Sequence, residues 1–156
     1  MKKDTSSRLL LLDVNVLLAL AWPNHQFHGA ATERLESSPI RWATCALTQL
    51  GFIRLSANPA AVSVAKSPAE AAALLRIMVQ DSQHVYLGSL PSPTEGDFGA
   101  AFARILGGKQ VTEVYLLELA RRHRATFVTF DIRLRSLAKG KAEVEILGAG
   151  PGETVL

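Results

Sequence analysis

The sequence predicts an α/β fold: a mainly parallel central sheet flanked by helices, forming an α/β/α sandwich. Short apolar, strand-like runs alternate with helix-like segments along all 156 residues, and this alternation is typical of parallel sheets. Two of the strand-like runs end on an acidic residue, Asp13 and Asp131. No repeat or linker-like stretch interrupts the pattern, so we expect a single domain over residues 1–156.

The first half of the chain begins with a predicted strand over 8–13, and the change to a helix over 14–21 falls at Asp13. We then expect a helix over 28–35, a strand over 41–44 and a helix over 48–55. A helix over 69–80 has a clear start signal: Ser67 as N-cap, Pro68 at the first position and Glu70 three residues after the cap, which together form a capping box.

The second half continues the alternation with a predicted strand over 84–87 and a helix over 97–106 that Gly107 and Gly108 end. Thr112 is expected to cap the next helix, over 113–123. Strands within 125–130 and over 143–147 complete the sheet.

Composition narrows the class of protein. Cys45 is the only cysteine, so a disulfide within the chain and a thiolate metal cluster are excluded, and a reducing, cytoplasmic setting is expected. Asp13 and Asn15 interrupt the long apolar run near the start, which argues against a membrane span. The formal net charge of +3 is mildly basic and is compatible with a nucleic-acid partner.

Positive charge gathers on both sides of the second acidic strand. The residues concerned are Arg121, Arg122, His123, Arg124, Arg133, Arg135, Lys139 and Lys141. Cations at a helix C-terminus explain the first group through the helix dipole. A rim that binds phosphate groups is the alternative.

Three acidic residues stand at the ends of predicted elements. A buried carboxylate such as Asp13 needs a cation or a hydrogen-bond donor, and the carboxyl ends of parallel strands face the ligand-binding edge of a sheet. Glu113 falls in the first turn of a predicted helix, where favourable interaction with the helix dipole would be a sufficient role. Together with Asp13 and Asp131, however, Glu113 completes a set of hard oxygen ligands suited to Mg²⁺ or Mn²⁺.

The chain resembles the PIN-domain family, and within it the VapC toxins of bacterial toxin–antitoxin pairs. The resemblance rests on LLDVNVLLAL (11–20), TCALTQLGFIRL (44–55) followed by Asn58-Pro59, QVTEVYLL (110–117) and FVTFD (127–131), in the order found in the family. It implies a PIN-like fold, metal-dependent endoribonuclease activity on RNA, a VapB-type antitoxin as partner and a homodimer. It implies no association with a membrane.

Carried over to these positions, the resemblance makes Asp13, Glu113 and Asp131 the catalytic metal ligands, with Mg²⁺ or Mn²⁺ as cofactor. Two positions depart from the pattern of many relatives, which have Glu where this chain has Gln49 and Asp where it has Glu113. Gln49 can offer a carbonyl oxygen but no charge, so we expect weaker attraction of the cation.

Supporting roles are expected for three further residues. Asn15 can orient Asp13 or a metal-bound water, although capping of the helix is an alternative. Thr129 lies two residues before Asp131 and therefore on the same face of its strand, although a plain strand-forming role is an alternative. Thr112 supports Glu113 by starting the helix that carries it.

Two other functions are compatible with parts of this pattern. The first is a noncatalytic PIN module with an RNA-binding or regulatory role, which we would expect if Gln49 has removed efficient metal binding from the site. A receiver-like phosphoacceptor domain also gathers carboxylates at strand ends, but the chain lacks its paired acids after the first strand and its lysine after a late one. A metal-dependent nuclease is the function that gives a role to all three acids.

Overall fold

The computed structural model describes residues 8–37, 40–138 and 143–148. Five parallel strands form one sheet in the order β3-β2-β1-β4-β5. The strands are β1 (Leu9–Leu12), β2 (Arg41–Cys45), β3 (His84–Leu87), β4 (Thr126–Thr129) and β5 (Glu143–Ile146). The predicted parallel sheet is therefore confirmed, and β1 lies at its centre.

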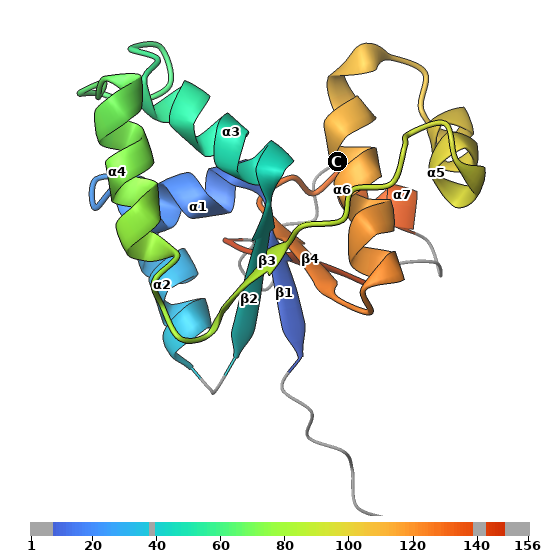
Figure 1. The fold of residues 1–156 in the computed structure, drawn as a ribbon, viewed down its shortest axis with the longest axis horizontal. Helices are drawn as coiled ribbons and strands as arrows, with labels where there is room; N and C mark the ends of the chain where they lie inside the picture. The colour runs from blue at the N-terminus through green and yellow to red at the C-terminus, as the bar shows by residue number, and fades with distance from the viewer. Residues whose placement is uncertain (1–7, 38–39, 139–142, 149–156) are drawn as a thin grey trace, which may run out of the picture.

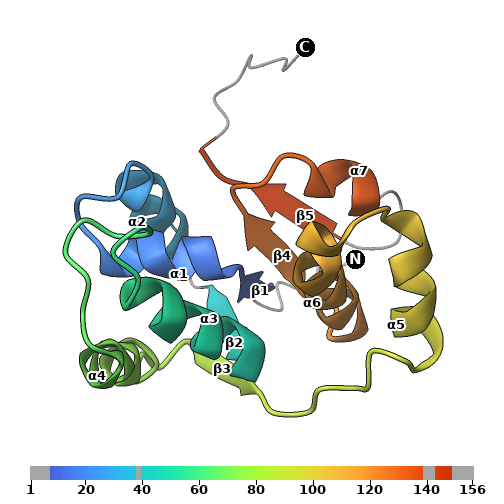
Figure 2. The same cartoon turned by 90° about the horizontal axis from the view of Figure 1, so that it is seen from above.

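Helices cover both faces of this sheet, as Figures 1 and 2 show. One layer consists of α1 (Val14–Ala21), α2 (His28–Glu36), α3 (Ala46–Ser56) and α4 (Pro68–Met78). The other contains α5 (Gly96–Ala101), α6 (Val111–Arg122) and α7 (Leu134–Ala138), with the 3₁₀ turns η1 (Phe102–Arg104) and η2 (Gly108–Gln110). The expected sandwich is confirmed. Within the described ranges, no helix is long and apolar enough to cross a membrane.

The central strand explains why the apolar run near the start of the chain is continuous. Leu10, Leu11 and Leu12 are fully buried, and their side chains alternate between two core clusters. Leu11 packs with Phe127 on the α6 side, whereas Leu10 and Leu12 pack with Val128 on the α1 side. A parallel strand covered on both faces has no polar side to show in its sequence.

Two helices of the structure differ in extent from the sequence expectation. The helix expected over 48–55 begins earlier, at Ala46, because Thr48 Oγ1 accepts a 3.0 Å hydrogen bond from the backbone N–H of Cys45 and so caps the preceding turn. The helix expected over 97–106 ends at Ala101 and continues as η1. Gly107 and Gly108 therefore do not end an α-helix.

The start of α6 also corrects the prediction for Thr112. The helix begins at Val111 with Gln110 at the N-cap position and no side-chain cap. Because η2 leads directly into α6, the backbone is already helical before Thr112, which lies exposed inside the first turn. The capping box at Ser67 and Glu70, by contrast, is confirmed.

Candidate active site

The three candidate acids come from separate elements that meet at the C-terminal edge of the sheet. Asp13 directly follows β1, and Asp131 lies two residues after β4. These two strands are neighbours, with Leu12 paired to Val128. Glu113 is in the first turn of α6, the helix that packs on this part of the sheet. The edge lies near the centre of Figure 1, where α1 leaves β1.

Asp13 is tightly held. Its side chain caps α1, with Oδ1 accepting a 2.7 Å hydrogen bond from the backbone N–H of Val14. Oδ2 accepts a 2.7 Å hydrogen bond from the hydroxyl of Thr129. Asn15 is consequently not the cap of α1; it is an exposed residue of the first turn.

The environment of Asp13 disfavours its charge. The residue is only 7% exposed, and burial raises the pKa of its carboxyl above the ordinary value. The hydrogen bonds from Thr129 and Val14 lower the pKa in part, while the nearby charges of Glu113 and Asp131 raise it further. An ionised Asp13 would therefore be stabilised by a cation at this edge.

Thr129 connects the two aspartates. It is fully buried, and its hydroxyl donates to Asp13 Oδ2. The Oγ1 atom of Thr129 also accepts a 3.1 Å hydrogen bond from the backbone N–H of Asp131. This one side chain therefore sets the position of Asp13 relative to the loop that carries Asp131.

Asp131 is occupied by an arginine. The guanidinium of Arg133 donates from Nε to Oδ1 at 2.9 Å and from Nη2 to Oδ2 at 2.7 Å. The backbone N–H of Arg133 adds a 3.0 Å hydrogen bond to Oδ1. The side-chain hydrogen bonds of Arg133 are the main reason why the pKa of Asp131 is lowered.

Glu113, unlike Asp131, has a carboxylate oxygen without a partner in the described part of the chain. Its Oε2 atom is buried and has no hydrogen-bond partner among the described residues. A buried carboxylate oxygen without a donor is costly, and a bound cation would satisfy it. The oxygen donors of Asp13, Glu113 and Asp131 fit a hard divalent cation in kind.

The carboxylates are not, however, converged on one point. Within the described ranges, no group of three His, Cys, Asp or Glu side chains is arranged to hold a metal ion. Both oxygens of Asp131 are engaged by Arg133. The oxygen donors suit Mg²⁺ or Mn²⁺ in their chemistry. Their arrangement in this structure is one in which Asp131 is bonded to Arg133.

Gln49 and Thr112 do not hydrogen-bond to these acids. The amide of Gln49 donates a 2.9 Å hydrogen bond to Thr44 Oγ1, which in turn lies 2.8 Å from Nε2 of His84. Thr112 is exposed on α6. Sequence reasoning did not single out Thr44, His84 or the pairing of Arg133 with Asp131; for the last, the short spacing from an acid to a basic residue was the available signal.

The basic residues divide between two places. Arg121 and Arg122 are in the last turn of α6, at the opposite end of that helix from Glu113. Arg121 pairs with Glu118 at 2.8 Å. Arg121 and Arg122 therefore lie at a helix end, as expected, and among the described basic residues Arg133 is bonded to one of the three acids, Asp131. Lys139 and Lys141 lie outside the described residues.

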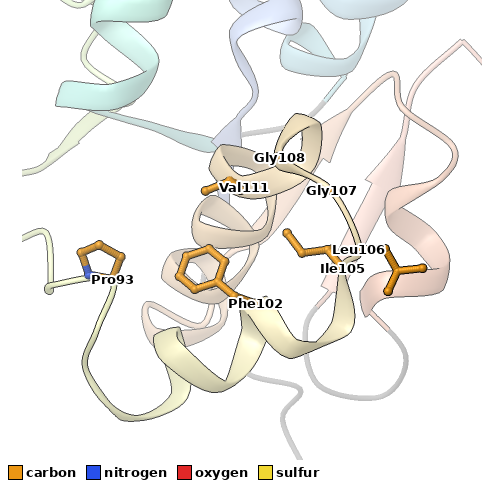
Figure 3. A pocket seen from close by; sticks show the side chains of 7 residues that line it. All are labelled: Pro93, Phe102, Ile105, Leu106, Gly107, Gly108 and Val111. Atoms are coloured by element: carbon orange, nitrogen blue, oxygen red, sulfur yellow. The ribbon is translucent and has the colours of Figure 1, made fainter.

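An apolar hollow of about 440 Å³ lies beside the start of α6 (Figure 3). Its lining comes from the loop before α5, the segment between α5 and α6, and the first residue of α6, namely Pro93, Phe102, Ile105, Leu106, Gly107, Gly108 and Val111. Leu106 is fully exposed and Val111 partly so. An uncovered apolar surface thus begins two residues before Glu113.

Comparison with known proteins assigns the family. The PIN domain family model matches residues 10–140. Ribonuclease VapC38 of Mycobacterium tuberculosis is 38% identical over 142 residues, covering 89% of this chain and 98% of the relative. Ribonuclease VapC39 of the same species is 38% identical over 136 residues, covering 86% and 97%.

A solved structure shows the same fold. The VapBC2 complex from Rickettsia felis, bound to a DNA fragment from their promoter, matches with a TM-score of 0.64 at 13% identity, over 89% of this chain and 98% of that chain. The chain therefore belongs to the PIN-domain family, and its relatives are VapC-type ribonucleases. This assignment rules out the receiver-like alternative.

Proposed function

We propose that this chain is a single PIN domain that acts as the toxin of a VapBC-type toxin–antitoxin pair, cleaving RNA as a Mg²⁺- or Mn²⁺-dependent endoribonuclease. The relatives named Ribonuclease VapC support the activity. The observation that carries the metal dependence is the state of the acids. Asp13 is buried with a raised pKa, and Glu113 has a buried oxygen without a partner.

In this proposal Asp13, Glu113 and Asp131 hold the cation. When bound, the ion would lower the pKa of a water molecule and neutralise charge on the scissile phosphate. The chain itself supplies positioning: Thr129 fixes Asp13 and the loop of Asp131 through one hydroxyl. Glu113 reaches the same edge from α6 and presents an oxygen that no described residue uses.

The remaining support comes from the rim of the site. Gln49 contributes a neutral side chain near the end of β2, where Thr44 holds its amide. Asn15 is exposed in the first turn of α1, which follows Asp13. Thr112 is exposed in the first turn of α6, which contains Glu113. We propose that these two exposed polar residues meet water or substrate at the edge of the site.

The proposed partners are RNA, a VapB-type antitoxin and a second copy of the chain. The name of the VapBC2 complex supports an antitoxin. A homodimer is supported by large apolar side chains that remain exposed between residues 50 and 90, namely Leu50, Val64, Ile77 and Tyr86. An RNA substrate and a lone reduced cysteine are consistent with action in the cytoplasm.

The test is cleavage of a total cellular RNA pool by the purified protein with Mg²⁺, with Mn²⁺ and with EDTA. We expect cleavage with either metal, none in EDTA, and little with Asp13→Asn. Glu33→Gln is the matched control, because Glu33 is exposed on α2 and far along the chain from the acids. Cleavage that persists in EDTA would overturn the metal dependence. Binding of RNA without cleavage under every condition would instead identify a noncatalytic module.

A further inference from the structure

We propose that Arg133 is an internal counter-cation of the acid site: its guanidinium holds Asp131 while no metal is bound and must leave Asp131 when an ion binds. The inference rests on the proposed metal-dependent function and assigns a role to a residue of this chain toward the ion. Arg133 would then set how tightly the site binds metal, without being a ligand itself.

In the ion pair, the guanidinium of Arg133 lies where a metal ion would bind to Asp131. Two guanidinium nitrogens of Arg133 face the two carboxylate oxygens of Asp131, at 2.9 and 2.7 Å. Such a two-point arrangement is the strongest form of an arginine–carboxylate contact. It uses the same oxygens that Asp131 would offer to a divalent ion.

Arg133 also interacts electrostatically with a second acid of the site, Glu113. The negative charge of Glu113 contributes to raising the pKa of Arg133, after the larger contribution of Asp131. Glu113 nevertheless keeps Oε2 buried without a partner among the described residues. Arg133 therefore offsets part of the negative charge of the cluster, and Oε2 of Glu113 is left as an oxygen that a bound cation would satisfy.

The side chain of Arg133 is also largely exposed to solvent. Its exposed fraction is 67%, whereas that of the Asp131 side chain is 23%. Exposed ion pairs contribute little net stability, because solvent screens them and a long side chain loses freedom in them. Leu134, the next residue, is fully buried and anchors the start of α7. The backbone is thus fixed while the guanidinium can turn into solvent.

This arrangement accounts for the unconverged acids. Within the described part of the chain, three carboxylates do not gather into a metal-binding group, and the two oxygens of Asp131 point to Arg133. If Arg133 competes with the ion, removing its charge should favour metal binding. If Arg133 instead helps to build the site, removing it should weaken binding.

The experiment measures Mn²⁺ affinity by calorimetry on the full chain, without RNA. We expect Arg133→Gln to bind Mn²⁺ about two- to fivefold more tightly than Arg135→Gln, which corresponds to the usual strength of an exposed ion pair. Arg135 is the matched control because it lies two residues further along, in α7, is exposed, and its side chain makes no hydrogen bond to a described residue. Its substitution removes the same charge without touching Asp131.

A second background isolates the contact itself. In Asp131→Asn, the anionic partner of Arg133 is gone, so adding Arg133→Gln should change Mn²⁺ affinity no more than adding Arg135→Gln does. Arg133→Lys keeps the charge and loses the two-point contact; we expect an affinity between wild type and Arg133→Gln. This milder variant serves as the test if Arg133→Gln does not fold, as judged by circular dichroism.

The outcomes separate the two proposals. Equal or weaker Mn²⁺ binding by Arg133→Gln, in a protein whose wild type binds the ion, would overturn the role of Arg133 and leave the metal-dependent function standing. No Mn²⁺ binding by wild type or by any variant would overturn both. Tighter binding that persists unchanged in the Asp131→Asn background would show that Arg133 acts by general charge alone, which also contradicts the proposal.

Discussion

The hydroxyl of Thr129 donates a 2.7 Å hydrogen bond to Oδ2 of Asp13, joining residues 116 positions apart at the ends of neighbouring strands. The bond lies in a fully enclosed position, since Thr129 is completely buried. It is the largest of the interactions that lower the pKa of Asp13 against the effect of burial. The candidate site thus has a buried half, formed by Asp13 and Thr129, and a more exposed half formed by Asp131 and Arg133.

Removing this hydroxyl should cost both stability and activity. Thr129→Val leaves Asp13 Oδ2 and the backbone N–H of Asp131 without a partner, and unpaired buried groups of this kind cost about 1–3 kcal/mol. We expect a lower free energy of unfolding in urea and weaker RNA cleavage. Thr129→Ser keeps the hydroxyl and should recover most of both. Equal losses in the two variants would indicate that packing of the methyl group, and not the hydrogen bond, matters here.

Neutralising Asp13 should separate stability from function. Asp13→Asn keeps the shape of the side chain and a carbonyl oxygen to cap α1, but removes a charge that burial and two nearby acids disfavour. We expect the metal-free variant to melt at a higher temperature than wild type at neutral pH, by about 2–4 °C if the gain is about 1 kcal/mol. Cleavage should be largely lost. Unfolding of this variant would show that Asp13 is a structural residue.

The stability gained by Asp13→Asn should depend on pH with a defined sign. The folded-state pKa of Asp13 is raised, so the wild-type carboxyl destabilises the fold fully above that pKa, and the effect declines as the pH falls from the raised pKa towards the ordinary one. The difference in Tm between variant and wild type should therefore shrink on acidification. A difference that grows at lower pH would contradict the assignment.

Adding a carboxylate at position 49 should tighten metal binding. Gln49→Glu places a further negative charge near the end of β2, and we expect higher Mn²⁺ affinity by calorimetry and more cleavage at limiting metal, with little gain at saturation. Without metal, repulsion among the acids should lower the melting temperature. Unchanged affinity would mean that the side chain at position 49 does not face the ion.

The same substitution has a second readout in the hydrogen-bonded chain from Gln49 through Thr44 to His84. The amide of Gln49 donates to Thr44 Oγ1; a carboxylate cannot donate, so Thr44 must donate to it and accept from Nε2 of His84 instead. Burial is the main cause that lowers the pKa of His84. We expect Gln49→Glu to raise that pKa, as measured by NMR titration of the His84 ring.

Glu118 anchors the second helical layer and should be sensitive to substitution. It is 4% exposed, and its two oxygens accept hydrogen bonds from Arg104 at 2.9 Å and Arg121 at 2.8 Å. Glu118→Gln removes the carboxylate that Arg104 and Arg121 share, although Arg121 keeps its ion pair with Asp97, and we expect a loss of about 1–3 kcal/mol in urea unfolding. The exposed control Glu33→Gln should change stability by less than about 0.5 kcal/mol. A similar effect in both would contradict this anchoring role.

Local signals in the sequence predicted much of the fold. The uninterrupted leucines of β1 indicate a strand covered on both faces, and the capping box at Ser67 and Glu70 marks the start of α4; both agree with the structure. Such features depend on neighbours in the chain. The helix α7 has five residues, which is too few for a helical period to be read, and the sequence analysis placed no element there.

The candidate site was predictable in its residues but not in its contacts. Two strands that end on acids indicate a shared edge, and Asp13 and Asp131 do meet there. The hydrogen bond between Thr129 and Asp13 depends on β4 lying beside β1, and the order of strands is a tertiary property. The pairing of Asp131 with Arg133 is local, yet spacing alone does not reveal whether an adjacent arginine binds an acid or points into solvent.

The most direct test of the metal site is anomalous X-ray diffraction from crystals of the wild-type protein grown with Mn²⁺. We predict one strong manganese peak at the C-terminal edge of the sheet, coordinated by oxygens of Asp13, Glu113 and Asp131, with the guanidinium of Arg133 no longer on Asp131. A manganese ion bound elsewhere, or a map with no peak at these carboxylates at saturating Mn²⁺, would contradict the claim that the three acids form a metal-dependent nuclease site.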